Sequence, residues 1–308
     1  MVRKESAGGA DPKGILAAVL TPMDQDLNPD HQAFAAHCQR LLAAGCHGLS
    51  VFGTTGEANS LSVGERLAAL KALAESGVPV EKLLPGTGSC ALTDTVRLSR
   101  AALEAGTAGA LVLPPFYYKG VGDDGLFRFF AEVVERLGDD RLRLYLYHIP
   151  QMTGIDLGLP LISRLIDAYP GVVVGTKDSS GDRERIMTLC REFPGFSVLA
   201  GTETLLLETL RSGGEGCISA TVNVTSRLTR RVHDAHAAGK HDEAEALQEH
   251  LTQVRASIEA YPVIPALKQL MARLTGDEQW RNIRPPLSGL DDKRTQDLLS
   301  NVPFTELL

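Results

Sequence analysis

The stretch GVVVGTKDSSGD, residues 171–182, is an apolar run that ends in a lysine followed by small polar residues. The β-branched residues 172–174 predict a strand that is buried on both faces, as the strands of a parallel sheet are. Lys177 at the end of this strand either pairs with a carboxylate or offers its amine for chemistry. The strand alone favours pairing, because buried lysines are rare and usually matched by an opposite charge. The rest of the sequence must decide between the two.

Short apolar runs of this kind alternate with helical stretches along the chain. The strand-like runs are residues 15–22, 48–53, 82–88, 109–115, 142–150, 172–177, 196–201 and 216–223. They recur in units of roughly 20–35 residues, a length that implies parallel strands joined by helical crossovers. Eight such units predict an α/β fold, with a closed (β/α)8 TIM barrel favoured over a doubly wound sheet. No GxGxxG motif follows the first run, which makes a dinucleotide-binding sheet the weaker alternative.

The strand pattern ends after about residue 226, and the remaining chain is typical of helices. We therefore expect a flexible N-terminal segment at residues 1–12, a catalytic barrel domain at 13–230 and a C-terminal helical domain at 231–308. The N-terminal segment lacks the apolar core of a signal peptide.

The composition limits the kinds of partner. A net charge of −7 at pH 7 argues against nucleic-acid binding, which needs clustered lysine and arginine. No apolar run reaches the roughly 18 residues of a membrane span. The five cysteines are scattered, without the Cys/His spacing of a structural zinc site. We expect a cytoplasmic protein without a nucleic-acid or membrane partner, whose ligand is a small molecule.

Polar side chains follow several of the predicted strands. In a parallel barrel the C-terminal strand ends carry the chemistry. The residues expected there are Thr54, Thr55, Glu57, Phe116, Tyr117, Tyr118, Tyr147, His148, Lys177, Ser179, Gly201 and Glu203. Lysine, tyrosine and hydroxyl groups thus converge on one rim, and no cluster of three histidine or carboxylate ligands for a catalytic metal is among them.

Each of these residues also has a structural interpretation. The threonines between glycines fit a helix cap, the tyrosines beside prolines fit packing, and Tyr147 fits a core position with a satisfied hydroxyl. His148 is expected to be neutral, and Glu57 to hold the geometry of its loop. Their joint arrangement nevertheless indicates a functional site.

Four motifs in one order make the chain resemble a known enzyme family. They are GTTGE (53–57), PPFYYKG (114–120), YHIPQMTG (147–154) and GTKDSSGD (175–182). With them the chain resembles the dihydrodipicolinate synthase/N-acetylneuraminate lyase (DapA-like) family of class I Schiff-base aldolases. The resemblance runs from about residue 14 to residue 290 and includes YPVIPALK (261–268) in the helical tail. It implies a lyase that needs no metal or organic cofactor.

The resemblance also implies catalytic roles. Lys177 would attack the ketone of pyruvate or another 2-oxo acid and form an iminium, which stabilises the enamine that follows. Tyr147 would move protons at the imine and the new hydroxyl, with Thr54 and Tyr117 linking it to solvent. In the family the tyrosine at the Tyr117 position usually reaches the neighbouring subunit's site, which implies a homodimer or homotetramer. The resemblance thus favours a catalytic amine at Lys177 over a lysine that pairs with a carboxylate.

A further set of residues is expected to bind substrate. Thr55, with backbone groups near Gly201 and Ile218, would hold the carboxylate of the 2-oxo acid. Met152, Ser179 and Glu203 complete the expected substrate-binding residues.

Departures from the family pattern bear on the substrate. Met152 stands where dihydrodipicolinate synthases usually carry an arginine that binds the carboxylate of the aldehyde, and a thioether cannot replace that cation. Cys90, Phe116 and Val63 stand where many synthases have the asparagine, tyrosine and histidine of a lysine-sensing pocket. Both differences count against lysine biosynthesis.

The other branch of the family fits only in part. N-acetylneuraminate lyases carry an apolar residue at the Met152 position, but they also use an acidic pair and a serine where this chain has Glu203-Thr204 and Ala220. We therefore expect a lyase or aldolase that joins pyruvate to an aldehyde or cleaves the product. Candidate substrates are a 2-keto-3-deoxy sugar acid and 4-hydroxy-2-oxoglutarate. A dehydratase or deaminase, a synthase that condenses pyruvate with aspartate semialdehyde, and a non-catalytic 2-oxo-acid-binding barrel remain alternatives.

Overall fold

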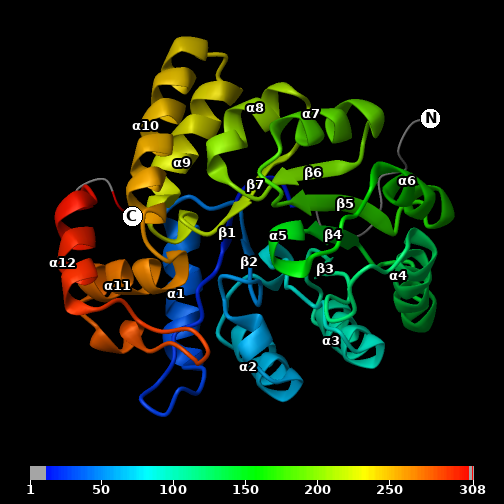
Figure 1. Cartoon of the computed structure of the whole chain (residues 1–308), viewed down its shortest axis with the longest axis horizontal. Coiled ribbons are helices and arrows are strands. Elements are labelled where there is room, and N and C mark those ends of the chain that lie inside the picture. Colours follow the sequence, from blue (N-terminus) through cyan, green and yellow to red (C-terminus); the bar gives the residue numbers. More distant parts are fainter. Residues whose placement is uncertain (1–11, 305–306, 308) are drawn as a thin grey trace.

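Seven short, buried strands form one parallel sheet that curls around a central core (Figure 1). The computed structural model describes residues 12–304 and 307, so the predicted N-terminal segment, apart from residue 12, lies outside the described residues. The strands are β1 (Gly14–Ala18), β2 (Gly48–Ser50), β3 (Ala110–Val112), β4 (Leu144–His148), β5 (Val173–Asp178), β6 (Ser197–Ala200) and β7 (Gly216–Ser219). Their order in the sheet is β2-β1-β7-β6-β5-β4-β3.

Residues 83–86 close the sheet into a barrel between its two edge strands. Leu83 forms a parallel bridge with Leu49, and Gly86 forms one with Leu111. The Leu84 amide donates to the Leu49 carbonyl at 2.8 Å. Proline has no N–H to donate, so Pro85 prevents a continuous ladder and leaves isolated bridges in place of a regular strand. Part of the predicted run 82–88 therefore takes the place of the eighth strand, and the predicted (β/α)8 barrel is confirmed.

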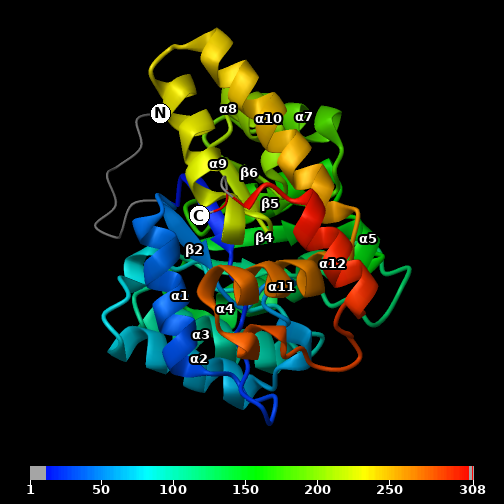
Figure 2. The same ribbon diagram turned by 90° about the vertical axis from the view of Figure 1, so that its left-hand side faces the viewer.

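Helices surround the barrel, and the last ones gather on one side of it (Figures 1 and 2). The α-helices are α1 (His31–Ala43), α2 (Val63–Glu75), α3 (Leu92–Glu104), α4 (Asp123–Leu137), α5 (Pro150–Thr153), α6 (Leu159–Ala168), α7 (Arg183–Glu192), α8 (Leu206–Arg211), α9 (Val222–Ala237), α10 (His241–Glu259), α11 (Val263–Thr275) and α12 (Asp292–Asn301). Side-chain caps stabilise the first turns of several helices. At α2, for example, Ser62 and Glu65 form a capping box. No helix in the described part of the chain is long and apolar enough to span a membrane.

The chain passes from the barrel to the C-terminal helices without a break. Helix α9 runs through residue 230, where we expected a domain boundary, and α10 packs along it. The predicted strand 216–223 was too long, because β7 ends at Ser219 and α9 begins at Val222. The β-branched residues there mimic a strand, but Asn223 lies in the first turn of α9. Its amide group donates to the carbonyls of Ala18 and Ala220, both at 2.7 Å.

The barrel interior is packed with side chains from alternate strand positions. Tyr145, Tyr147, Leu199 and Ile218 belong to this inner cluster. A Cβ atom added to Gly175 would lie 2.5 Å from the Tyr145 ring, so glycine leaves the room that this ring fills. Side chains therefore fill the barrel interior, and a ligand binds at the C-terminal ends of the strands.

His37 on α1 is fully buried. Its Nε2–H donates to Asn223 Oδ1 at 2.9 Å, and its ring lies edge-on to Trp280. Burial lowers the pKa of His37 to about 4, while the bond to Asn223 works in the opposite direction. The folded protein therefore keeps this imidazole neutral at a pH where an unfolded chain would protonate it.

We expect the protein to lose stability as the pH falls from about 6.5 toward 4. The unfolded chain binds the His37 proton in this window and the folded chain does not, so protonation favours unfolding. His37 alone should make the free energy of unfolding about 2 kcal/mol lower at pH 5 than at pH 8. Urea unfolding of the wild type and of His37→Gln across this range measures the difference. Equal pH slopes for the two proteins would rule out the His37 contribution.

Candidate active site

Lys177 lies near the C-terminal end of β5, opposite Tyr147 on β4 in the sheet register. Its side chain is almost fully buried, and its Nζ donates to the Tyr147 hydroxyl at 3.3 Å. The same nitrogen lies 4.4 Å from the centre of the tyrosine ring. Among the described residues no carboxylate lies within ion-pair distance of Lys177. Lys177 is therefore buried without the carboxylate partner that a buried structural lysine usually has.

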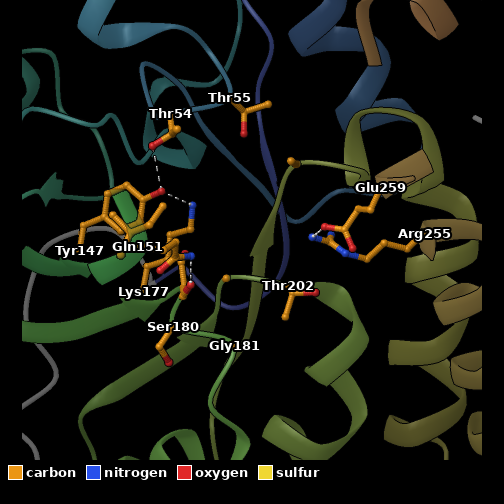
Figure 3. A pocket seen from close by; sticks show the side chains of 14 residues that line it. Thr54, Thr55, Tyr147, Gln151, Lys177, Ser180, Gly181, Thr202, Arg255 and Glu259 are labelled. Atoms are coloured by element: carbon orange, nitrogen blue, oxygen red, sulfur yellow. Dashed lines mark hydrogen bonds and ion pairs between the residues drawn. The ribbon is translucent and has the colours of Figure 1, made fainter. Parts of the chain in front are cut away.

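The Tyr147 hydroxyl joins Lys177 to a third group. Thr54 Oγ1 lies 3.2 Å from this hydroxyl, so the three side chains form one chain of hydrogen bonds (Figure 3). Such a chain can pass a proton between the lysine nitrogen and the loop that carries Thr54.

The loop that carries Thr54 has an unusual backbone. Phe52 and Glu57, which flank it, have φ angles of 57° and 55°, in the left-handed region that residues with side chains rarely adopt. A Cβ atom added to Gly56 would lie 2.8 Å from the Val19 carbonyl oxygen. Strained positions of this kind persist only where the surroundings hold them.

A buried ion pair holds this loop to the C-terminal helices. Glu57 Oε1 lies 2.5 Å from Lys268 Nζ on α11, and both side chains are buried. Lys268 also donates to the Asn282 carbonyl at 2.6 Å, and the Arg284 amide donates to Glu57 Oε2 at 3.0 Å. Burial lowers the pKa of Lys268, and the nearby Glu57 carboxylate counteracts it. Glu57 thus holds loop geometry, as its structural interpretation predicted.

A pocket of about 360 Å³ opens above Lys177 (Figure 3). It is lined by Thr54, Thr55, Tyr147, Ile149, Gln151, Lys177, Ser179, Ser180, Gly181, Gly201, Thr202, Ala220, Arg255 and Glu259. Six of the ten residues expected in the site are in this set: Thr54, Thr55, Tyr147, Lys177, Ser179 and Gly201. The C-terminal ends of strands from across the chain therefore meet at one pocket.

The structure does not bring the other four expected residues into the pocket. Tyr117 is 74% exposed and packs edge-on against Tyr118, and Met152 is 63% exposed. Ile218 lies below the pocket in the barrel core. Glu203 is fully buried, and its carboxylate is already engaged by neighbouring side chains.

The carboxylate of Glu203 belongs to a polar cluster behind the pocket wall. Arg255 on α10 donates to it, as do the hydroxyls of Ser219 and Thr221. Burial would raise the pKa of Glu203, but the Arg255 charge and these hydrogen bonds outweigh burial and lower it. The structure therefore places Glu203 as a partner of Arg255, and Arg255 as the side chain at the pocket surface.

His148 points away from the pocket, into the layer outside the barrel. Its Nδ1 accepts a hydrogen bond from the Leu157 amide at 3.3 Å, and its Nε2 lies 3.9 Å from Asp178. Burial lowers the pKa of His148, while the Asp178 carboxylate opposes this shift. Arg185 donates to Asp178 at 2.6 Å, so this carboxylate has a cationic partner other than His148. A neutral, structural His148 agrees with its structural interpretation.

Comparison with known proteins identifies the family. A model of the dihydrodipicolinate synthetase family matches residues 11–303. The chain belongs to this family. Curated relatives include an uncharacterized DapA-like lyase of Chloroflexus aurantiacus, which is 35% identical over 94% of this chain and 95% of its own. The 4-hydroxy-tetrahydrodipicolinate synthase of Thermus thermophilus is 33% identical over 89% of this chain and 90% of its own.

Solved structures of family members share the fold. YagE, an Escherichia coli prophage protein of this family solved in complex with pyruvate, is 29% identical, with a TM-score of 0.85 over 94% of this chain and 96% of its own. A variant of the 2-keto-3-deoxygluconate aldolase of Sulfolobus solfataricus is 25% identical, with a TM-score of 0.84 over 94% of each chain. The proteins that this chain resembles are thus named as a lyase, as synthases and as an aldolase.

Sequence reasoning missed part of the pocket wall. Arg255 and Glu259 lie on α10, one helical turn apart, in a helix rich in charged residues. Nothing in their spacing separates them from an ordinary solvated helix face. Gln151 lies next to Met152 in the motif YHIPQMTG (147–154), but we did not predict it as a site residue. Its side-chain amide donates to the Ser179 carbonyl at 2.6 Å.

Replacing Lys268 by methionine should destabilise the protein, because it leaves the buried Glu57 carboxylate without its cation. We expect a loss of about 3–5 kcal/mol in the free energy of unfolding. Urea unfolding measures it, with Lys71→Met as the control. Lys71 forms an exposed pair with Glu75 on α2, so its loss should matter little. The double variant Glu57→Gln/Lys268→Met should lose less than Lys268→Met. Equal losses for Lys268→Met and Lys71→Met would contradict a structural role for the buried pair.

Proposed function

We propose that this protein is a Schiff-base lyase that makes or cleaves a carbon–carbon bond between pyruvate and an aldehyde. The observation that carries the proposal is a buried Lys177 with no carboxylate at ion-pair distance among the described residues. Its amine instead faces the Tyr147 hydroxyl inside a pocket large enough for a small acid. YagE, a family member solved with pyruvate, supports pyruvate as the first substrate.

The reaction begins at the amine. Uncharged Lys177 Nζ attacks the ketone carbon of pyruvate, and loss of water from the adduct gives an iminium. The iminium draws electrons from the adjacent methyl carbon, which loses a proton, so that an enamine forms. The enamine carbon then attacks the aldehyde carbon, and the aldehyde oxygen takes up a proton. Water finally hydrolyses the iminium, which frees the product and Lys177.

Tyr147 has the position needed to move these protons. Its hydroxyl contacts both Lys177 Nζ and Thr54 Oγ1, so it can give a proton to the departing water and recover one through Thr54. Thr55 lines the same pocket with a nearly buried side chain, and we assign its hydroxyl to the pyruvate carboxylate together with backbone groups near Gly201. These assignments need no metal ion or organic cofactor.

The second substrate is an aldehyde. The favoured products are a 2-keto-3-deoxy sugar acid or 4-hydroxy-2-oxoglutarate, and the likeness to a 2-keto-3-deoxygluconate aldolase supports this class. Met152, exposed at the rim, offers no cation to an aldehyde carboxylate. The alternative, condensation with aspartate semialdehyde, is supported by the 4-hydroxy-tetrahydrodipicolinate synthase relative. Turnover of pyruvate with aspartate semialdehyde, compared with other aldehydes, separates the two.

We also propose that the protein acts as a homodimer or homotetramer. Tyr117 and Tyr118 are 74% and 73% exposed and pack edge-on, with ring centres 5.3 Å apart. Exposed paired aromatic rings are typical of a surface that another chain covers. Tyr117 of one subunit would then complete the proton relay in the next.

The deciding experiment traps the imine. Purified protein is incubated with pyruvate, reduced with borohydride and digested, and the added mass is located by peptide mass spectrometry. We expect the adduct on Lys177 in the wild type and none on the folded Lys177→Ala variant. A folded wild-type protein that gives no adduct with excess pyruvate would overturn the proposed chemistry, and with it the bond-forming function.

Replacing Tyr147 by phenylalanine should remove the proton carrier and leave the ring in place. We expect kcat to fall by about 10²–10³, the scale of a lost general acid–base group. The rate of pyruvate-dependent turnover measures it, and unfolding in urea checks that the variant is folded. An unchanged kcat would exclude Tyr147 from the mechanism.

A further inference from the structure

The wall of the pocket formed by α10 carries its own charges. Figure 3 shows Arg255 and Glu259 across the pocket from Lys177 and Tyr147. Both side chains come from the C-terminal helices, whereas Lys177 and Tyr147 come from the barrel strands. One end of the pocket therefore has the groups for bond formation, and the other end is lined by a helix.

Two carboxylates surround the single cation of this wall. Arg255 Nη1 donates to the buried Glu203 carboxylate and, at 2.7 and 2.8 Å, to the hydroxyls of Ser219 and Thr221. Its Nη2 donates to Glu259 Oε1 at 2.6 Å. Burial opposes the charge of Arg255, but the attraction of Glu203 and Glu259 raises its pKa above the usual value. Two negative charges against one positive charge leave the wall with a net charge of −1.

The exposed part of this charge is on Glu259. Its side chain is 41% exposed, whereas those of Glu203 and Arg255 are 0% and 9% exposed. A molecule entering the pocket therefore meets the Glu259 carboxylate directly, while the guanidinium is enclosed by partners that already accept its hydrogen bonds.

The charges at the other end cancel once pyruvate is bound. The iminium on Lys177 is positive, and the carboxylate that pyruvate brings is negative. Lys177, Arg255 and Glu259 are the charged residues that line the pocket in the described part of the chain. The second substrate consequently reacts in a pocket whose uncompensated charge is the negative wall.

We propose that Glu259, backed by Arg255 and Glu203, selects an aldehyde with an uncharged hydroxylated chain and rejects one that ends in a carboxylate. The inference rests on the proposed function, and it narrows the second substrate to the aldehydes released from deoxy sugar acids. Carboxylate oxygens accept hydrogen bonds from hydroxyl groups, and Thr202 and Ser180 add hydroxyls to the same lining. A second carboxylate would instead be repelled by Glu259.

The test compares two aldehydes that differ at one end. Glyceraldehyde and tartronate semialdehyde have the same three-carbon hydroxyaldehyde skeleton, but the second has a carboxylate in place of the hydroxymethyl group. With saturating pyruvate, we expect the wild type to have a kcat/KM about tenfold higher for glyceraldehyde. Glu259→Gln should reduce this preference about fivefold, chiefly by raising kcat/KM for tartronate semialdehyde, since one partly screened charge is removed.

Glu249→Gln is the matched control. Glu249 is an exposed residue of the same helix and does not line the pocket, so its replacement changes the net charge equally and should leave the preference within about twofold of wild type. Borohydride trapping of pyruvate on Lys177 is measured in all three proteins.

The outcomes separate the two proposals. Normal trapping together with a wild-type preference for tartronate semialdehyde, or with equal preferences in Glu259→Gln and Glu249→Gln, overturns the selection by Glu259 and leaves the imine chemistry standing. Normal trapping with turnover of neither aldehyde also overturns it. Absence of trapping in the wild type overturns the proposed function itself, and the inference that rests on it.

Discussion

The register between β4 and β5 is the constraint on which the site depends. It places Tyr145 opposite Gly175 and Tyr147 opposite Lys177, with alternate side chains directed into the barrel. The first pair packs, because the missing side chain of Gly175 makes room for the Tyr145 ring. The second pair lies two residues further along the strands and carries the proposed chemistry. Because side chains alternate between the faces of a strand, a slip of one residue would turn Lys177 out of the barrel.

Three buried basic side chains, Lys268, Arg255 and Lys177, have different partners in the fold. Lys268 pairs with Glu57 and fixes the Thr54 loop, and Arg255 pairs with two carboxylates and shapes the pocket wall. Lys177 faces a hydroxyl group instead. Matched charges in a protein interior hold structure in place, because each neutralises the other. Among the described residues Lys177 has no such partner, and the proposed imine chemistry uses this amine.

The barrel and the centre of the site could be predicted from the sequence, and the rim could not. Apolar runs and strand-end positions are local signals, so they placed Lys177, Tyr147 and Thr54 on one rim. Glu203 also follows a strand, but its partner Arg255 is 52 residues away along the chain. No local sequence pattern predicts that these two residues pair. The run 216–223 mimicked a longer strand because helix α9 starts with β-branched residues. Tyr117 and Met152 are exposed in the single chain, so their expected roles depend on contacts beyond it.

The division of the pocket between strands and helix has a consequence for how such an enzyme diversifies. The proposed nucleophile and its proposed proton relay lie on β4, β5 and the loop after β2, whereas Arg255 and Glu259 lie on α10. Under the proposed function, substitutions on that helix would alter which aldehyde enters without moving the Lys177 amine or Tyr147. An ancestral barrel could therefore acquire new acceptors through changes in its C-terminal helices alone, and keep its bond-forming step intact throughout.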